Sequence, residues 1–99
     1  MSDTLRHDTV FPDGPAPAAA LLEPLLAKAA GPQAEPVSLT LDYGLAPAVG
    51  DPVVVEAWVD RATRTLVFAH ARLLNGAGDL VASGSAVFRR PAPPADQVN

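Results

Sequence analysis

The chain has 99 residues, of which 48% are apolar and 18% charged, and its formal net charge is -4. A chain of this length supports one hydrophobic core, because two cores would each be too small to exclude water. The seven lysines and arginines are scattered, whereas nucleic acid binding needs clustered positive charge, so we expect no nucleic acid partner. The absence of cysteine excludes a disulfide framework, a thiolate metal site and a cysteine nucleophile.

The sequence contains no segment typical of export or of membrane insertion. Residues 1–8 are polar and of mixed charge, unlike the apolar core of a secretory signal. The longest apolar stretch, residues 16–30, includes two charged residues and a central proline, and it is shorter than the roughly 20 residues that span a bilayer. We therefore expect a cytoplasmic protein with no membrane partner.

A turn followed by a helix is predicted in the first third of the chain. Pro12-Asp13-Gly14-Pro15 is a turn pattern, and Pro17 suits a first helical turn, where its missing N–H needs no partner. The helix is expected over about residues 16–30, since Gly31-Pro32 ends it. Pro24 leaves the Ala20 carbonyl without its usual donor and predicts a kink. The face expected to be buried carries residues spaced by three and four: Ala18, Leu21, Leu22, Leu25 and Ala29.

Four β-type segments follow the helix, and each is rich in β-branched, leucine or aromatic residues. They cover about residues 37–43, 53–60, 65–74 and 80–89. The last three are separated by short turns, which predicts antiparallel hairpins and excludes a doubly wound parallel sheet. We expect a single domain over residues 1–90 and a disordered proline-rich tail over residues 91–99.

Two parts of the chain resemble the strands of hotdog-fold acyl-CoA thioesterases, of the phenylacetyl-CoA or 4-hydroxybenzoyl-CoA thioesterase type. The motif Ser38-Leu39-Thr40-Leu41-Asp42-Tyr43 and residues 46–57 are similar to the second and third strands. Residues 64–73 and 78–89 are similar to the last two, so the resemblance covers about residues 36–90. It implies an α+β hotdog fold, in which a central helix (about 16–30) is wrapped by a curved antiparallel sheet of four main strands. A short N-terminal strand around residues 5–11 would complete that sheet.

The resemblance assigns the chemistry to one acidic residue on the helix. In this family such a residue acts as general base or nucleophile on the thioester, and Glu23 occupies that position as the only acid of the helix. The alternative is that Glu23 is an ordinary solvent-facing or interface residue. Its neighbours on the same side are mostly small, so a ligand can approach closely: Ala16, Ala19, Ala20, Leu26, Ala27 and Ala30.

The loop before the helix departs from the family pattern. Active relatives carry His-Gly-Gly there, whose backbone N–H groups bind the thioester oxygen, whereas this chain has Gly14-Pro15-Ala16. Pro15 and Pro17 have no N–H, so Gly14, Ala16 and Ala18 are the remaining donors. We take Gly14 and Ala16 as substrate-binding candidates, and the departure favours a protein that has lost catalysis.

Positive and aromatic side chains supply the other binding candidates. Arginine matches phosphate oxygens through paired hydrogen bonds, and by resemblance Arg64 is the best candidate for the phosphates of coenzyme A. Arg61, Arg89 and Arg90 are further candidates, and the alternative for each is a solvated charge at a strand end or hairpin. Trp58 points away from the predicted core and is a candidate oligomer contact.

The remaining polar residues have ordinary explanations. His7 lies near the position at which hotdog dehydratases carry a histidine that pairs with a helical glutamate, but we interpret it as a surface residue. His70 is expected to be a packing or interface residue, and Ser83 and Ser85 small packing residues. Two separated histidines make no metal site, so no metal and no cofactor are expected.

The sequence therefore leaves two main interpretations. The first is a thioesterase-like hydrolase that takes acyl-CoA or another acyl thioester between the subunits of a homodimer or a dimer of dimers, with Glu23 catalytic. The second is a non-catalytic hotdog protein that binds an acyl ligand or only assembles. A dehydratase-like protein is a more distant third.

Overall fold

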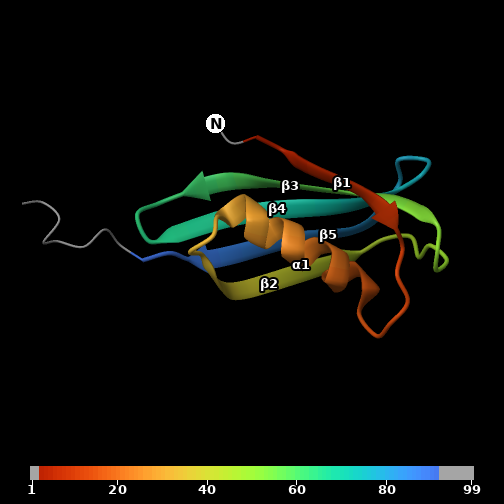
Figure 1. Ribbon diagram of the computed structural model, residues 1–99, viewed down its shortest axis with the longest axis horizontal. Helices are drawn as coiled ribbons and strands as arrows, with labels where there is room; N and C mark the ends of the chain where they lie inside the picture. The colour runs from red at the N-terminus through yellow and green to blue at the C-terminus, as the bar shows by residue number, and fades with distance from the viewer. Residues whose placement is uncertain (1–2, 92–99) are drawn as a thin grey trace, which may run out of the picture.

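The computed structural model describes residues 3–91, which form one helix and five strands (Figure 1). The chain is α+β, as predicted, and its first strand is the short one expected before the helix. The observed boundaries differ from the expected ones by at most two residues at each end. In chain order the elements are β1 Leu5–Val10, α1 Pro17–Ala30, β2 Glu35–Tyr43, β3 Pro52–Ala62, β4 Leu66–Asn75 and β5 Leu80–Arg89.

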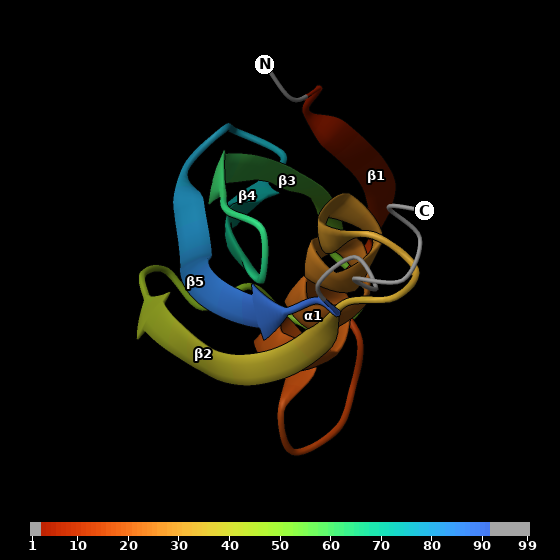
Figure 2. The same ribbon diagram turned by 90° about the vertical axis from the view of Figure 1, so that its left-hand side faces the viewer.

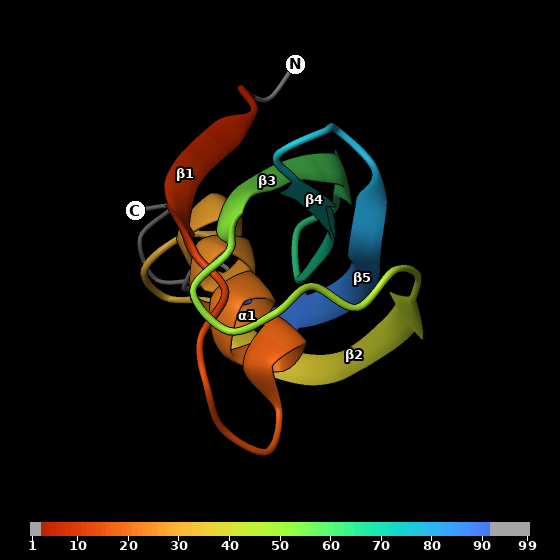
Figure 3. The same ribbon diagram turned by 90° about the vertical axis from the view of Figure 1, so that its right-hand side faces the viewer.

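All five strands belong to one antiparallel sheet in the order β1-β3-β4-β5-β2. The predicted hairpins between β3 and β4 and between β4 and β5 are present. The strand that follows the helix, β2, instead crosses to the far edge and pairs with β5. Seen from its two ends, the sheet curls around α1, so that β1 and β2 lie on opposite flanks of the helix (Figures 2 and 3).

The helix fits into the curve because the middle of the sheet carries small side chains. Ala57, Ala71 and Gly84 lie side by side on β3, β4 and β5, and each is buried. Leu22 packs over this row and is 0% exposed. A Cβ atom added to Gly84 would lie 3.7 Å from Leu22 Cδ1 and 3.2 Å from Leu41 Cδ2. Larger side chains here would therefore push the helix away from the sheet.

The buried sector of α1 differs from the predicted stripe at several positions. Leu26 is 1% exposed and belongs to the core, although its helical position had placed it among the small residues beside Glu23. The sheet curls far enough around α1 to cover that side of the helix as well. Leu21 and Leu25, predicted to be buried, are only partly so. The helix continues through Pro24 to Ala30, and Gly31 follows it with a φ of 113°.

The face of the sheet that is turned away from α1 carries a polar and aromatic ladder. Trp58 is half-buried there, with its ring centroid 5.1 Å from that of His70. The Ser85 hydroxyl lies 3.0 Å from His70 Nδ1 and is exposed, so its interpretation as a small packing residue was wrong. In the described part of the chain, no helix is long and apolar enough to span a membrane.

Candidate functional site

Glu23 lies at a cavity of about 170 Å³ between α1, β2 and β5. Among the described residues that line the cavity it is the only ionisable one, and it is exposed in the single chain. Two of its predicted helical neighbours, Leu26 and Ala27, line the same cavity. The remaining lining residues come from the β2 region and from β5: Ala34, Pro36, Ser38, Leu39, Ala86 and Phe88. The cavity therefore joins one carboxylate to a largely apolar wall.

The β2 wall of the cavity is shaped by an irregularity in strand pairing. Pro36 is opposite Phe88 and Ser38 is opposite Val87, so Val37 is an extra residue at this point in β2. Such a bulge bends the strand and increases its twist. Phe88, which is 4% exposed, forms the floor. Sequence reasoning missed Phe88, although a bulky aromatic in a strand of otherwise small inward residues was a usable signal.

The opposite flank of the helix has its own cavity, of about 280 Å³, between α1 and β1. His7 and Lys28 line it together with Ala20, Leu21, Pro24 and Leu25. His7 and Glu23 therefore line different cavities on either side of α1. The structure does not bring together the histidine and glutamate that a dehydratase would pair.

The loop before α1 offers fewer backbone donors than its sequence suggested. The Gly14 N–H donates to the Asp13 side chain, with the nitrogen 2.8 Å from Oδ1. Ala16 is the N-cap residue and makes no side-chain cap hydrogen bond, while its carbonyl accepts the Ala20 N–H at 3.0 Å. Both Gly14 and Ala16 are exposed, and neither is among the residues that line the Glu23 cavity.

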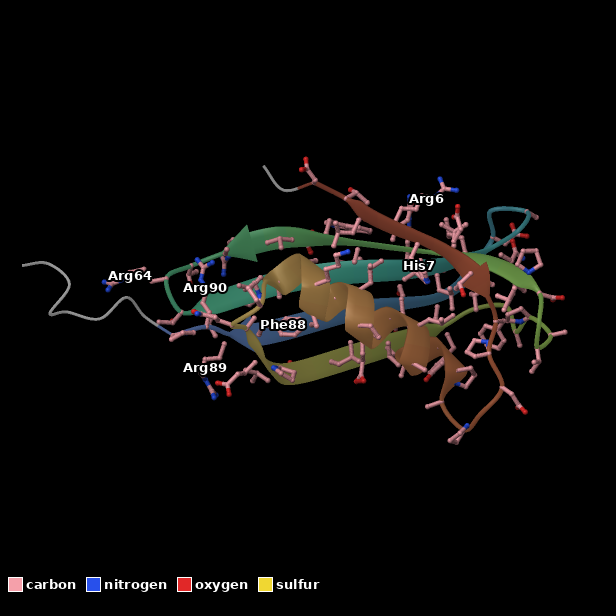
Figure 4. All side chains as sticks on the ribbon, viewed as in Figure 1. Arg6, His7, Arg64, Phe88, Arg89 and Arg90 are labelled. Carbon is pink, nitrogen blue, oxygen red and sulfur yellow. The ribbon has the colours of Figure 1, made fainter. Side chains whose placement is uncertain are left out.

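Three arginines gather at the other end of the molecule, where Arg64, Arg89 and Arg90 surround the end of the sheet near Phe88 (Figure 4). Arg90 is held in place because its guanidinium donates to the carbonyls of Thr63 and Arg64. Arg64 and Arg89 are exposed. The fourth candidate, Arg61, lies over the Phe68 ring with Cζ 4.8 Å from the ring centroid.

The predicted site residues therefore fall into two groups: those at or beside the Glu23 cavity, and those in the loop before α1. Arg89 directly follows Phe88, so the arginine end adjoins the floor of the Glu23 cavity (Figure 4). Arg64 lies at that end, whereas Gly14 and Ala16 lie beyond the N-terminus of α1. Among residues 3–91, no group of three or more histidines and carboxylates is close enough to hold a metal ion.

Solved structures of other proteins, a thioesterase superfamily member among them, share this architecture. Thioesterase superfamily member 2 from zebra fish matches with a TM-score of 0.80 at 21% identity, over 89% of this chain and 75% of that chain. A Streptococcus mutans protein, smu.793, solved with bound acetyl CoA, matches with a TM-score of 0.78 at 14% identity, over 90% and 82%. A mutant of the phenylacetic acid degradation protein PaaI from Thermus thermophilus matches with a TM-score of 0.76 at 20% identity, over 91% and 85%.

At these identities the likeness establishes the hotdog fold alone. No curated protein sequence matches the chain. A family model described as acyl-CoA thioesterase N-terminal domain matches residues 9–89, which include the helix, the four main strands and the Glu23 cavity. Because the match spans most of the 99 residues, the chain belongs to the family of acyl-CoA thioesterase N-terminal domains.

Proposed function

We propose that this hotdog protein binds an acyl thioester, with acyl-CoA as the expected form, at the Glu23 cavity and hydrolyses it. The observation that carries the proposal is that Glu23 is the one ionisable group among the described residues of an otherwise largely apolar lining. An apolar wall suits an acyl chain, while a few polar groups orient the ligand and perform the chemistry.

Glu23 would act as the general base. Its carboxylate takes a proton from water as the water oxygen attacks the thioester carbonyl. The carbon–sulfur bond then breaks and Glu23 returns the proton to the leaving sulfur, which gives a carboxylic acid and a thiol and restores the carboxylate. The carboxylate is exposed in the single chain, so it is accessible to both water and ligand. A ligand that fills the cavity would exclude bulk water and strengthen the electrostatic interactions of the carboxylate.

The arginine end supports coenzyme A as the thiol part of the ligand. Arg64 and Arg89 are exposed near Phe88, which forms the cavity floor (Figure 4). Guanidinium groups bind phosphate oxygens through charge-assisted, paired hydrogen bonds. Arg90 has a different role in this proposal, since its hydrogen bonds to backbone carbonyls fix the shape of this end.

A second candidate is acyl-ligand binding without turnover, and the loop before α1 favours it. Pro15 and Pro17 have no N–H, and the Gly14 N–H is already bonded to Asp13. Stabilising the oxyanion would then depend on Ala16 and Ala18, or on release of Gly14 from Asp13. Removing a single oxyanion donor typically costs about 100-fold or more in kcat, so this loop decides between the two candidates.

We also propose that the protein forms a homodimer. Within the described chain, β2 is an edge strand with no neighbour on its outer side, and it forms one wall of the Glu23 cavity. Unpaired strand edges are commonly covered by another strand, and homo-oligomers usually form through two-fold symmetric contacts. The outer sheet face around Trp58 is the corresponding candidate for joining two dimers.

The test is hydrolysis of acyl-CoA substrates from acetyl to palmitoyl, together with phenylacetyl-CoA, followed by release of free thiol. The chain has no cysteine, so a thiol reagent reports on the product alone. We expect Glu23→Gln to lower kcat by about 100-fold, the lower end of the usual range for a general base. Lys28→Gln, on the opposite flank of the same helix, is the matched control and should stay within about twofold of the wild type.

The outcomes separate the candidates. Absence of turnover with measurable binding of acyl-CoA by calorimetry would leave the binding protein as the function. Absence of both turnover and binding would reject both candidates. Equal turnover in Glu23→Gln and the wild type would remove Glu23 from the mechanism.

A further inference from the structure

The flank of α1 towards β1 leaves apolar side chains of the helix uncovered. β1 has 6 residues, whereas the other strands have 9 to 11, and in the described chain no strand lies outside it. The cavity of about 280 Å³ that remains there has an apolar wall from the helix, made by Ala20, Leu21, Pro24 and Leu25. Pockets for small molecules usually begin at roughly 300 Å³, so this cavity has room for a small ligand.

His7 is directed into this cavity by the pleat of β1. It is opposite Val55, which is 0% exposed and belongs to the core, and residues opposite each other in a sheet share a face. Arg6 and Asp8 therefore lie on the outer face, where Arg6 Nε is 3.1 Å from Asp8 Oδ1. Figure 4 shows Arg6 and His7 on opposite sides of the strand. The carboxylate next to His7 in the sequence thus has its own partner on the other face.

Neither His7 nor Lys28 has a hydrogen bond or ion pair from its side chain within the described chain. The ion pairs of residues 3–91 involve other cations, on the outer face of β1 and between β3 and β4. The described residues that line the cavity include no carboxylate. In a chain whose net charge is -4, two nitrogen bases beside an apolar wall without an acid favour a negatively charged ligand.

The two bases suit a carboxylate, whose two oxygens can each accept a hydrogen bond. The Lys28 ammonium has three donors, and the His7 imidazole keeps at least one N–H in either protonation state. Charge-assisted hydrogen bonds of this kind are stronger than neutral ones. Phosphate is better matched by the planar fork of arginine, and the described lining of this cavity has no arginine. The apolar wall leaves room for a short hydrocarbon chain.

We propose that the β1 flank of α1 is a second ligand site, which binds a monocarboxylic acid with a short apolar chain. Lys28 and His7 bind the carboxylate, and the chain lies along Leu21 and Leu25. The site is separate from the Glu23 cavity on the other flank. The acid that hydrolysis would release is of this class, and that link alone rests on the proposed function.

The site is tested with octanoate, which joins an apolar chain to one carboxylate. We expect saturable binding in an NMR titration with a Kd of about 1 mM, the affinity that about ten non-hydrogen atoms reach at an ordinary energy per atom. The chain has two histidines, so each titration contains its own control. The ring signals of His7 should shift, whereas those of His70, beside Trp58 on the outer face, should not. A spectrum of His7→Gln assigns the two rings.

Other ligands separate the chain from the charge. Octanol has the chain without the charge and acetate has the charge without the chain, so both should bind at least about tenfold more weakly than octanoate. Octyl phosphate should bind no more tightly than octanoate. Equal affinity for octanol and octanoate would overturn the recognition of a carboxylate. Tighter binding of octyl phosphate would overturn the carboxylate in favour of a phosphate head group.

Substitution of Lys28 tests the head-group contact. Lys28→Met keeps an apolar stem of similar length without the charge, and it should raise the Kd for octanoate by about tenfold, the effect of one charge-assisted hydrogen bond. Lys28→Arg keeps the charge and should stay within about threefold of the wild type. Arg61→Gln removes a cation over the Phe68 ring on the outer face, and as the matched control it should leave the Kd within about twofold. An unchanged Kd in Lys28→Met, with circular dichroism showing that the variant is folded, would overturn the site.

Glu23→Gln distinguishes the two cavities. If octanoate bound in the Glu23 cavity, this variant would remove a like charge and tighten binding, whereas binding on the β1 flank should not change. Tighter binding in Glu23→Gln, with no shift of the His7 signals, would overturn the proposal. Octanoate is bound and not hydrolysed, so absence of turnover would leave this site standing. Absence of octanoate binding would likewise leave the proposed hydrolysis standing.

Discussion

The two flanks of α1 belong to one helix, yet they carry side chains of opposite charge. The flank towards β2 holds a carboxylate, Glu23, above an apolar floor. The flank towards β1 holds two nitrogen bases, His7 and Lys28, beside half-buried leucines. The helix alone does not explain this division, because Glu23 and Pro24 are sequence neighbours that line different cavities.

The two flanks differ because different numbers of strands meet the helix at the two edges of the sheet. On the β2 flank three elements meet, since β5 supplies Phe88 as a floor behind the edge strand. On the β1 flank the described residues that line the cavity come only from the helix and one short strand. The strands beside the helix therefore define the Glu23 cavity as much as the helix residues do. The following experiments test this division.

The largest expected effect comes from removing the side chain that holds both flanks in place. Leu22 is 0% exposed and packs into the row of small sheet residues, so Leu22→Ala should lower the free energy of unfolding by about 3 kcal/mol. Urea denaturation followed by circular dichroism measures it. Leu25→Ala, at a half-buried position, should cost about 1 kcal/mol. Equal costs for the two would show that Leu22 is not the main anchor.

The next experiment moves the carboxylate from the β2 flank to the β1 flank and asks whether activity follows it. The double variant Glu23→Gln/Lys28→Glu keeps one acid on the helix but places it in the β1 cavity. We expect its kcat to remain about 100-fold below the wild type, because the transferred acid has no access to the Phe88 cavity. Recovery of kcat in a thiol-release assay would show that the flank is irrelevant.

A smaller effect is expected from the floor of the β2 flank. Phe88→Leu keeps an apolar side chain but leaves the floor incomplete, so it should lower stability by about 1 kcal/mol. The affinity for acyl-CoA, measured by calorimetry, should change with it. Phe68→Leu is the matched control on the outer sheet face, where Phe68 pairs with Val87, and should leave that affinity unchanged. Equal changes in both variants would argue against the cavity as the ligand site.

The smallest effect belongs to the β1 flank. Lys28 lies in the last turn of α1, where a positive charge interacts favourably with the helix dipole. Lys28→Gln should therefore cost about 0.5 kcal/mol of stability, read from the urea midpoint, and the loss should shrink in high salt. A loss that is independent of salt would indicate a packing role for the lysine stem instead.

Local sequence patterns predicted the helix and the strands well, but they did not predict that β2 pairs with β5. Short turns identified the β3–β4 and β4–β5 hairpins, and Gly31-Pro32 marked the end of the helix, because both signals depend on neighbouring residues. Pairing of β2 with β5 joins residues that are 39 (Tyr43 and Ala82) to 54 (Glu35 and Arg89) positions apart, which no local periodicity records. Leu26 was misplaced for a related reason, since the width of the buried helix sector is set by the curl of the sheet.

The candidate site could likewise be predicted only where it depends on neighbouring residues. The helical neighbours of Glu23 could be read from spacing, and Leu26 and Ala27 do line its cavity. Phe88 and Pro36 could not, because they reach the cavity through the β2–β5 pairing and its bulge. The separation of His7 from Glu23 likewise depends on which sheet edge β1 occupies.

The loop after β2 is anchored at both ends by backbone hydrogen bonds, so its middle can be exchanged. At one end the Gly44 and Leu45 N–H groups donate to β5. At the other end the Phe11 N–H donates to the Asp51 carbonyl and the Gly50 N–H donates to the Phe11 carbonyl, each at 2.8 Å. Residues 46–49 span the gap between them. This short span could be exchanged for loops of other lengths while both anchors stay fixed, which would vary the surface beside the exposed Tyr43 and Leu45 without rebuilding the sheet.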